Sequence, residues 1–431
     1  MIDPEIGFTS DAIKDPNRFV GRTELIRRCV QGLNSPVSLL AIYGKRGVGK
    51  SSLLRQIQQL ALGDYTLVKQ AGLTHEIPKK PRTFLTIYYS CDSLITSGES
   101  LLGRLCNDQD AEDGLLRLVP DDGKELTEFT RTKEVSGGAD LKLVNWGVKG
   151  IEASKYARVI PNDVAQTFRN YVSAIISHQV RKRMGRDGLL ILLDEFDVIQ
   201  DKHGLGSVIK SLTSANVKFG ICGIGQDLND LVADHASVER LLEQGAIHVR
   251  PMETPEAKQI INRAEELFQG AITFDEAVKD KICEVAQGYP YFVQMLGRAC
   301  VTKANQGQTN RVGAEVLNSV MDDIKGGIAF PTLESAYQRA AGDSDGRKWL
   351  LHILADQPDE PAHIAGDMGR VFLKNARKDA SDLSVEYVDQ LLPRLLDKKF
   401  GPVLRSVPEG RGIYEFLNPV FRLYVRLRNM N

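Results

Sequence analysis

Several signals of common functional classes are missing from this 431-residue sequence. Its six cysteines form no C-x-x-C pair and its seven histidines form no H-E-x-x-H pattern, so zinc is not indicated. No apolar run approaches the roughly 18 residues of a membrane span. The first residues show neither the basic nor the apolar part of a signal peptide. We therefore expect free buried thiols, a cytoplasmic location and no membrane partner.

An excess of charge of one sign is also absent. Charged residues make up 26% of the chain, yet the formal net charge is only -1. This balance argues against a generally polycationic nucleic-acid binder, while it permits a local basic face. With 42% apolar residues, the chain has enough material for two or three domains with cores of their own.

Short apolar runs alternate with helical patterns in the first 250 residues. The runs are residues 37–43, 83–89, 188–194, 218–224 and 246–251, and the helical patterns between them include residues 51–62, 165–184 and 238–243. Strands that alternate with helices form a parallel sheet covered on both faces. The pattern predicts an α/β fold with a parallel sheet between helical layers.

The chain divides into three predicted domains. Residues 1–250 form the α/β core, with an insertion at about 107–160 between the second and third strands. Residues 251–340 show four amphipathic stretches and predict a helical bundle. Residues 341–431 predict helices followed by a β-hairpin around Pro408–Gly412, which is typical of a winged helix-turn-helix.

The stretch G-K-R-G-V-G-K-S fits the phosphate-binding pattern G-x-x-x-x-G-K-[ST], and it lies between a predicted strand and a predicted helix. Glycines let the backbone wrap around phosphate oxygens, and the helix turns its positive end toward the same anion. Lys50 can reach the outer phosphates, and the Ser51 hydroxyl can ligate Mg²⁺. The expected nucleotide-binding residues here are Gly44, Lys45, Arg46, Gly47, Val48, Gly49, Lys50, Ser51 and Ser52.

A second motif, L-L-I-L-L-D-E-F-D, places carboxylates at the end of an apolar strand. We expect Asp194 to hold the Mg²⁺ shell and Glu195 to orient and polarise the attacking water. Asp197 is expected to cap the next helix rather than to act in catalysis. Two carboxylates that close a buried strand would be costly without a cation nearby, so the two motifs together predict a nucleotide site that hydrolyses its ligand.

No guanine-reading N-K-x-D motif occurs, which disfavours a GTPase. Three further stretches are more specific: N-R-F-V-G-R-T-E-L at residues 17–25, Q-G-Y-P-Y-F-V-Q at 287–294 and Y-E-F-L-N-P-V-F-R-L-Y-V-R-L-R at 414–428. With the two motifs above, the chain resembles the AAA+ P-loop ATPases of the replication-initiator (origin-recognition-like) and STAND group, in particular prokaryotic ATPases with a C-terminal winged helix. The resemblance covers nearly the whole chain.

The resemblance implies further site residues. Phe19, Val20, Gly21 and Arg22 would lie beside the adenine of ATP or ADP, and Pro290 would approach the nucleotide from the lid. The arginine that other AAA+ enzymes carry beside the lid motif has no counterpart here, since Arg298 comes two helical turns later. This departure favours a slow, STAND-like switch over a fast motor.

The resemblance also implies a residue that contacts the γ-phosphate or the attacking water, and an arginine that reaches the ATP of a neighbouring copy. Gln226 or Asp227 follows the fourth strand at the sensor position, although the usual Asn, Thr or Ser is absent. Arg240 is the candidate arginine finger that would reach the ATP of a neighbouring copy in an ATP-bound homo-oligomer. A solvated or internally paired arginine is an equally good interpretation of Arg240.

Two outputs of ATP hydrolysis remain open. In the first, ATP controls an assembly on double-stranded DNA that binds through the winged helix, whose basic residues alternate with acidic ones. The basic set is Arg370, Lys374, Arg377, Lys378, Arg394, Lys398, Lys399, Arg405 and Arg411. In the second, the chain is a signalling switch for an unidentified protein partner without nucleic acid, and the 107–160 insertion is the recognition element.

Overall fold

The computed structural model describes most of the chain and all five predicted strands. The described residues are 1–36, 39–107, 114–119, 164–177, 180, 185–225, 240–242, 245–357, 362–363, 388–407 and 412–428. The insertion at about 107–160 and Gln226 therefore lie almost wholly outside the described residues. Within the described ranges, no helix combines the length and apolarity that crossing a bilayer requires.

The chain separates into two compact units. The sheet unit consists of Ala12–Gly44 and Lys50–Val249, and the lid unit consists of Met1–Asp11, Lys45–Gly49 and Arg250–Asn431. The phosphate-binding loop thus connects two segments of the sheet unit, while its five central residues group with the lid unit. The predicted boundary between a helical bundle and a C-terminal domain near residue 340 stays a prediction.

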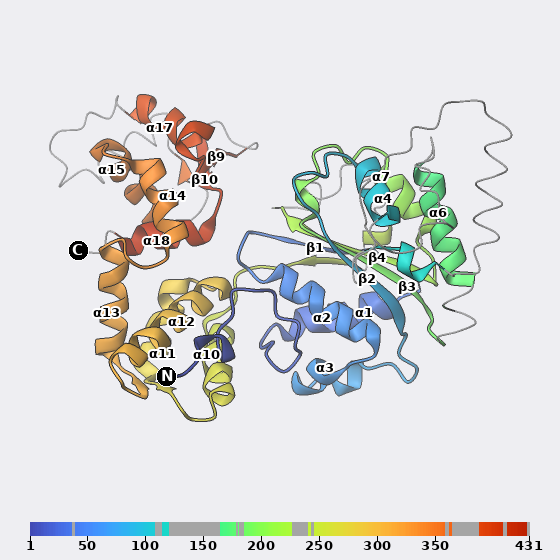
Figure 1. Ribbon diagram of the computed structural model, residues 1–431, viewed down its shortest axis with the longest axis horizontal. Coiled ribbons are helices and arrows are strands. Elements are labelled where there is room, and N and C mark those ends of the chain that lie inside the picture. Colours follow the sequence, from blue (N-terminus) through green and yellow to red (C-terminus); the bar gives the residue numbers. More distant parts are fainter. Residues whose placement is uncertain are drawn as a thin grey trace, which may run out of the picture. The chain divides into compact units, whose positions relative to one another are not determined.

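The sheet unit contains one parallel sheet of five strands in the order β2-β3-β4-β1-β5 (Figure 1). The strands are β1 (Leu39–Gly44), β2 (Phe84–Ser90), β3 (Gly188–Asp194), β4 (Val217–Ile224) and β5 (Ala246–His248). Every residue of β3 is buried, as expected for a central strand of a parallel sheet with both faces covered. The α/β prediction is confirmed.

Helices cover both faces of this sheet (Figure 1). They are α1 (Thr23–Asn34), α2 (Lys50–Leu62), α3 (Thr66–Gln70), α4 (Gly98–Asn107), α6 (Val164–Ala174) and α7 (Leu205–Leu212), with short 3-10 turns η2 (Thr74–Glu76), η3 (Leu116–Leu118) and η5 (Phe196–Val198). Helices α1 and α2 lie on one face, and α4, α6 and α7 lie on the other. Parallel strands need crossover connections, which these helices provide. Because all five strands are parallel, their carboxyl ends lie at one edge of the sheet, where ligands bind in such folds.

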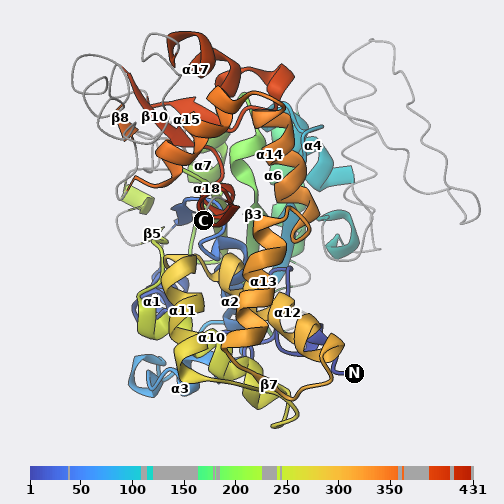
Figure 2. The same ribbon diagram turned by 90° about the vertical axis from the view of Figure 1, so that its left-hand side faces the viewer.

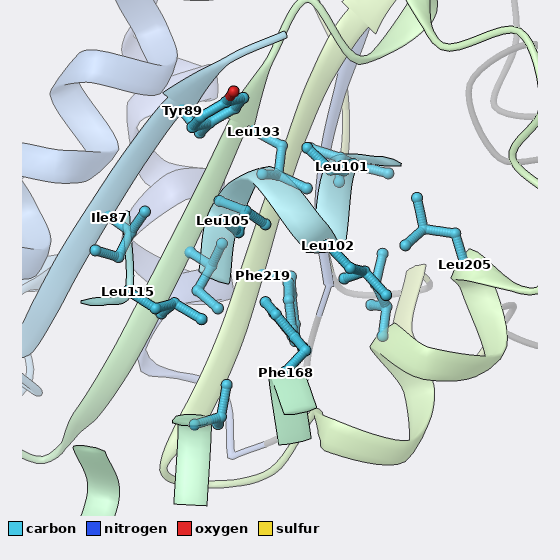
Figure 3. Close-up of a cluster of buried hydrophobic side chains, with 14 of the residues drawn as sticks. Ile87, Tyr89, Leu101, Leu102, Leu105, Leu115, Phe168, Leu193, Leu205 and Phe219 are labelled. Atoms are coloured by element: carbon cyan, nitrogen blue, oxygen red, sulfur yellow. The ribbon is translucent and has the colours of Figure 1, made fainter. Parts of the chain in front are cut away.

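The core under α4, α6 and α7 fixes the positions of the strands. Phe168 of α6 and Phe219 of β4 are buried together with leucines of α4 and with Leu193 of β3 (Figure 3). Removing a buried side chain of this size costs about 3–5 kcal/mol, so such a core holds the strand ends rigidly. A rigid sheet is what positions the functional groups at its edge.

The lid unit begins with a helical bundle. Its elements are η1 (Pro4–Ile6), α10 (Thr254–Leu267), α11 (Glu276–Ala286), α12 (Pro290–Gln306) and α13 (Ala314–Lys325), and a small parallel pair joins β6 (Thr273–Phe274) to β7 (Arg311–Val312) (Figure 2). The four helices occupy the four predicted amphipathic stretches, while a separate bundle domain at 251–340 stays a prediction. The β6–β7 pair was not expected, since two residues per strand leave no periodicity to detect.

The first residues of the chain pack into this bundle. Phe8 is fully buried and its ring lies 6.0 Å from that of Phe268 and 5.8 Å from that of Phe274. A Cβ atom on Gly297 of α12 would lie 2.3 Å from Phe8, so glycine at that position makes room for the ring. The N-terminal segment is therefore part of the bundle core.

The rest of the lid unit combines helices with a small sheet. The elements are α14 (Pro331–Ala341), α15 (Asp345–Ala355), β8 (Ala362–His363), α17 (Val388–Leu396), η7 (Lys398–Phe400), β9 (Leu404–Ser406), β10 (Ile413–Phe416) and α18 (Pro419–Arg428). The three strands are antiparallel in the order β8-β10-β9 (Figure 2). The predicted hairpin around residues 408–412 is present as the β9–β10 pair, and its tip lies outside the described residues.

Candidate nucleotide site

The phosphate-binding motif folds as its sequence predicts. Strand β1 ends at Gly44, helix α2 begins at Lys50, and the residues between them belong to neither. Gly47 and Gly49 have φ angles of 83° and 95°, in the left-handed region that favours glycine. With 13 residues, α2 is long enough to present a positive N-terminal end to an anion in the loop.

Two hydroxyl residues follow Lys50, and one of them, Ser52, bonds to another segment of the protein. Lys50 is 8% exposed, and Ser51 and Ser52 are half-buried. The Ser52 hydroxyl accepts the backbone N–H of Ile13 at 3.1 Å. Ser52 therefore attaches the segment before α1 to the start of α2, whereas Ser51 is the hydroxyl predicted for the metal.

Asp194 closes β3 as a nearly buried carboxylate, 5% exposed, with hydrogen bonds to both oxygens. Its Oδ1 accepts the backbone N–H of Glu195 at 2.9 Å, and its Oδ2 accepts the hydroxyl of Tyr88 at 2.5 Å. Burial and the neighbouring carboxylate raise the pKa of Tyr88, so the phenol stays protonated and donates a hydrogen bond to Asp194. Tyr88 was not among the residues expected in the site.

The buried thiol of Cys222, on the strand next to β3, is affected by the charges of both Asp194 and Lys50. Burial raises the pKa of Cys222 in β4, the charge of Asp194 and a hydrogen bond to that carboxylate raise it further, and the charge of Lys50 lowers it. Both charged groups therefore act on one buried atom at the carboxyl edge of the sheet. The structure brings together the lysine and the aspartate of two motifs that lie about 140 residues apart in the sequence.

Glu195 differs sharply from its neighbour. It is exposed, and its backbone is left-handed, with φ 53° and ψ 34°, at the start of η5. A left-handed backbone at a residue other than glycine is uncommon and is concentrated at functional sites. The two carboxylates are thus separated: Asp194 lies inside the protein and Glu195 is open to solvent.

Asp197 does not cap a helix, contrary to the expectation. It lies inside η5, and its Oδ1 accepts the backbone N–H of Ile224 at 2.7 Å. Ile224 is the last residue of β4. The bond joins the turn that carries Glu195 to the end of the neighbouring strand, which no local pattern in the sequence could reveal.

The F-V-G-R stretch forms the entry to α1. Phe19 and Arg22 are buried, and Gly21 and Arg22 have positive φ angles of 67° and 61° before the helix begins at Thr23. Val20 is half-buried. The stretch therefore has the fixed, sharply turned backbone that a base-contacting loop needs, while its role toward adenine stays a prediction.

The lid motif has a backbone that only glycine fits. Gly288 has φ 77°, and a Cβ atom there would lie 2.3 Å from the carbonyl oxygen of Met252. Pro290 is the first residue of α12, and its Cγ lies 3.6 Å from the position of a Cβ on Gly49. The backbone N–H of Tyr291 donates to the carbonyl of Gly47 at 3.4 Å. These contacts, all inside the lid unit, put Pro290 beside the glycines of the phosphate-binding loop.

An arginine does reach the lid motif, but from a distant part of the sequence. Arg422 of α18 is 5% exposed, and its Nη1 donates to Gln287 Oε1 at 3.0 Å. Its Nη2 also donates to the carbonyl of Gln357. Gln287 directly precedes Gly288. Sequence inspection missed this arginine because 135 residues separate it from its partner.

The remaining predicted residues are less informative. Arg240 is exposed, and the described residues 240–242 are helical. Gln226 lies outside the described residues, as do Arg370, Lys374, Arg377, Lys378 and Arg411. Arg405 pairs with the buried Glu415 at 2.5 Å, so part of its charge is neutralised inside the protein.

The donor set fits a magnesium ion held together with a nucleotide. Mg²⁺ prefers oxygen ligands and takes only one or two from a protein when phosphates supply others. Asp194 provides a carboxylate and Ser51 a hydroxyl, and both are hard oxygen donors. Within the described part of the chain, no group of three or more His, Cys, Asp or Glu residues is placed to hold a metal without such help.

A parallel α/β sheet with a glycine-rich loop before α2 and a buried carboxylate at the end of β3 defines a P-loop NTPase. Residues 7–299 match the model of the family described as Novel STAND NTPase 1, nSTAND1, which is about two thirds of the chain. The chain belongs to this family. The resemblance to the STAND group is confirmed.

Three solved structures illustrate what the chain is similar to. They are the ORC1 protein of Aeropyrum pernix in complex with DNA (12% identity, TM-score 0.43, covering 99% of this chain and 96% of that one), the RuvB Holliday junction branch migration motor of Thermotoga maritima (12%, 0.43, 94% and 96%) and Cdc6p of Pyrobaculum aerophilum (12%, 0.41, 99% and 98%). No curated protein matches the chain. Because these TM-scores are low, the family assignment rests on the sequence model.

Proposed function

We propose that the protein is a Mg²⁺-dependent ATPase that hydrolyses ATP slowly and uses its nucleotide state as a switch. The observation that carries this proposal is the pair Asp194 and Glu195, one buried and hydrogen-bonded, the other exposed on a left-handed backbone. A protein that only stores nucleotide has no need of the second carboxylate. Membership of an NTPase family supports the same conclusion.

The residues divide the chemistry as follows. Backbone N–H groups of the loop and the Lys50 ammonium bind the phosphates, and Asp194 and Ser51 orient the metal shell. Mg²⁺ supplies charge neutralisation on the phosphate oxygens. Glu195 orients a water molecule for attack on the γ-phosphorus and draws off its proton, as the bond to the bridging oxygen of ADP breaks. The products are ADP and phosphate.

The output that we favour is a nucleotide-controlled assembly on double-stranded DNA. The order β8-β10-β9, with α15 before β8 and α17 before β9, supports the proposed winged helix-turn-helix. Exposed Arg394, Lys398 and Lys399 follow one another on α17 and η7. Such a basic stretch suits phosphate contacts that depend little on base sequence.

Assembly would bring a further group to the site. In this proposal Arg240, exposed near the end of the sheet unit, reaches the ATP of a neighbouring copy. Arg240→Ala should then slow hydrolysis at concentrations where copies associate, without weakening nucleotide affinity. If dilution and the substitution both leave the specific rate unchanged, hydrolysis needs no finger from a second copy.

A specific contact favours the second candidate, a switch that acts on a protein partner. Arg422 of α18 bonds to Gln287 beside the lid motif, so the C-terminal helix can respond to the lid without any DNA. In this case the helices of the C-terminal segment serve as a packing module. The 107–160 insertion is then the recognition element.

One titration separates the two outputs. Glu195→Gln protein held with ATP is titrated with labelled duplex DNA at several salt concentrations, with wild-type protein and ADP as the control. Affinity that appears only with ATP and falls steeply with salt supports the DNA-associated assembly, because phosphate contacts release counterions. Absence of DNA binding in both states rejects it and favours the protein switch.

A further inference from the structure

Two adjacent tyrosines of β2, Tyr88 and Tyr89, lie on opposite faces of the sheet. Tyr89 belongs to the buried cluster under α4 and α6 (Figure 3). Because side chains alternate along a strand, Tyr88 lies on the other face, against which α2 packs. Tyr88 is 3% exposed, so its hydroxyl group needs a partner inside the protein.

That partner is the carboxylate at the end of the neighbouring strand. Tyr88 is paired in register with Leu192 of β3, and Asp194 is paired with Ser90. The Tyr88 side chain therefore extends two positions along the sheet toward its carboxyl edge, and its hydroxyl donates to Asp194 Oδ2. A phenylalanine would fill the same space without making this bond.

The phenol ring is itself held by the helix that follows the phosphate-binding loop. The guanidinium carbon of Arg55 in α2 lies 3.2 Å from the centre of the Tyr88 ring. Stacking of a guanidinium on an aromatic ring is favourable and restricts the ring's orientation. Arg55 is only five residues after Lys50, so one helix carries both the predicted phosphate-binding lysine and the residue that fixes Tyr88.

With both oxygens bonded, Asp194 has little rotational freedom. Glu195 N–H fixes Oδ1, and the Tyr88 hydroxyl fixes Oδ2. Hydrogen bonds to a ligating carboxylate orient it toward a metal, and their loss typically costs about 10–100-fold in metal affinity or activity. The bond from Glu195 comes from the backbone and depends little on residue type, whereas the bond from Tyr88 depends on a single side-chain oxygen.

We propose that Tyr88, held by Arg55, is a positioning residue that orients Asp194 toward the magnesium shell of the bound nucleotide. This inference rests on the proposed Mg²⁺-dependent ATPase function. It adds a residue from β2 that neither motif contains. A merely structural tyrosine would affect stability alone, whereas a positioning tyrosine affects how strongly Mg²⁺ tightens nucleotide binding.

The test compares Tyr88→Phe with Tyr89→Phe, which removes the same oxygen from a buried tyrosine one residue away. A fluorescent ATP analogue is titrated into wild type and both variants, first with excess EDTA and then at a series of Mg²⁺ concentrations. For Tyr88→Phe, we expect an unchanged affinity for the ATP analogue in EDTA. The Mg²⁺ concentration at which binding of the analogue is half-maximally strengthened should be roughly tenfold higher than for wild type. Tyr89→Phe should match wild type in both series.

Repeating the Tyr88→Phe comparison in Asp194→Asn protein distinguishes an effect of Tyr88 on the orientation of Asp194 from an effect on packing. There, Tyr88→Phe should produce no additional change in the Mg²⁺ series, because the group through which it acts has been removed. Thermal unfolding of each variant checks that it folds. If Tyr88→Phe does not fold, Arg55→Leu keeps the hydroxyl while freeing the ring, and should shift the Mg²⁺ series in the same direction.

The outcomes are distinct. A Tyr88→Phe protein with the Mg²⁺ dependence of wild type, or an equal shift in Tyr89→Phe, overturns the role of Tyr88 and leaves the ATPase proposal standing. Wild-type protein that binds the analogue without any Mg²⁺ effect, or does not bind it, rejects the proposed function and the inference with it. A shift confined to Tyr88→Phe and absent in the Asp194→Asn background supports both.

Discussion

Asp197 Oδ1 accepts the backbone N–H of Ile224 at 2.7 Å, and this bond joins the turn after β3 to the last residue of β4. The turn carries Glu195, whose left-handed backbone is inherently unfavourable and depends on its surroundings. The β4 strand in turn leads to the residues predicted to sense the γ-phosphate. Asp197 therefore joins two segments of the predicted site, although it has no predicted role in catalysis.

Asp197→Ala should destabilise the protein and slow hydrolysis together. The N–H of Ile224 would lose its partner in a half-buried position, which costs about 1–3 kcal/mol of unfolding free energy. Urea unfolding and steady-state turnover measure the two effects. Asp201→Ala is a matched control, because the Asp201 carboxylate accepts the exposed backbone N–H of the nearby His203 and, among the described residues, joins no distant segment. A normal rate in Asp197→Ala would show that the turn needs no support from β4.

Lys50→Ala should abolish ATP binding while leaving the fold intact. The lysine is the first residue of α2 and is nearly buried, and its charge acts at the carboxyl edge of the sheet. Calorimetric titration with ATP measures the loss, and Lys69→Ala, an exposed lysine of α3, serves as the control. Unchanged affinity in Lys50→Ala would contradict the assignment of the loop.

The strands and their motifs could be predicted from the sequence because each has a local signal. Continuous apolar runs such as L-L-I-L-L predict strands buried on both faces, and the glycine and lysine spacing of residues 44–51 identifies the loop. Contacts that depend on strand register or on distant segments have no such signal. Tyr88 reaches Asp194 only because β2 and β3 are neighbours in that register.

The same limit explains why the roles of Phe8 and Arg422 in the lid unit were not predicted. Phe8 looks like an ordinary residue of a polar N-terminal stretch, yet it fills a space that Gly297 leaves open in the bundle. Arg422 lies in an amphipathic helix with two further arginines, Arg426 and Arg428, and nothing local in the sequence marks it as the one that bonds to the Gln287 side chain. Burial of each residue is decided by tertiary packing, which composition and periodicity do not encode.

Lys218 should make stability depend on pH above neutrality. Its ammonium is buried at the start of β4 and donates to the carbonyls of Ser35 at 2.6 Å and Gly32 at 3.4 Å. Burial, followed by the positive charge of Arg82, lowers the pKa of Lys218 from 10.5 to about 8. Between these two values the unfolded chain binds more protons than the folded protein, so the free energy of unfolding rises with pH in that window.

Lys218→Met should remove this rise. Urea unfolding at intervals from about pH 7.5 to about pH 10.5 gives the slope for wild type and variant, since the lysine titrates in that range. Lys210→Met, at an exposed position of α7, controls for loss of a lysine in general. Identical slopes in wild type and Lys218→Met would show that the folded protein does not depress the pKa of Lys218.

Arg422 should couple the C-terminal helix to the lid motif. Arg422→Met removes the hydrogen bonds that this nearly buried arginine donates to Gln287 Oε1 and to the carbonyl of Gln357, at a cost of about 1.5–3 kcal/mol in unfolding free energy. Gln287→Asn shortens the partner while keeping a residue that tolerates its left-handed backbone, φ 47°. If the contact is energetically significant, the double variant should lose less stability than the sum of the two single ones.

The control for Arg422 lies one turn further along the same helix. Arg426 of α18 is one third exposed and pairs at 3.7 Å with Asp356, whose side chain is 65% exposed, so Arg426→Met should change stability little. A large loss in both arginine variants would indicate that α18 needs its positive charge as a whole. A loss confined to Arg422→Met, together with faster release of a fluorescent nucleotide, would show that the helix acts on the lid through Gln287. Unaltered release in a destabilised Arg422→Met protein would reduce the contact to packing.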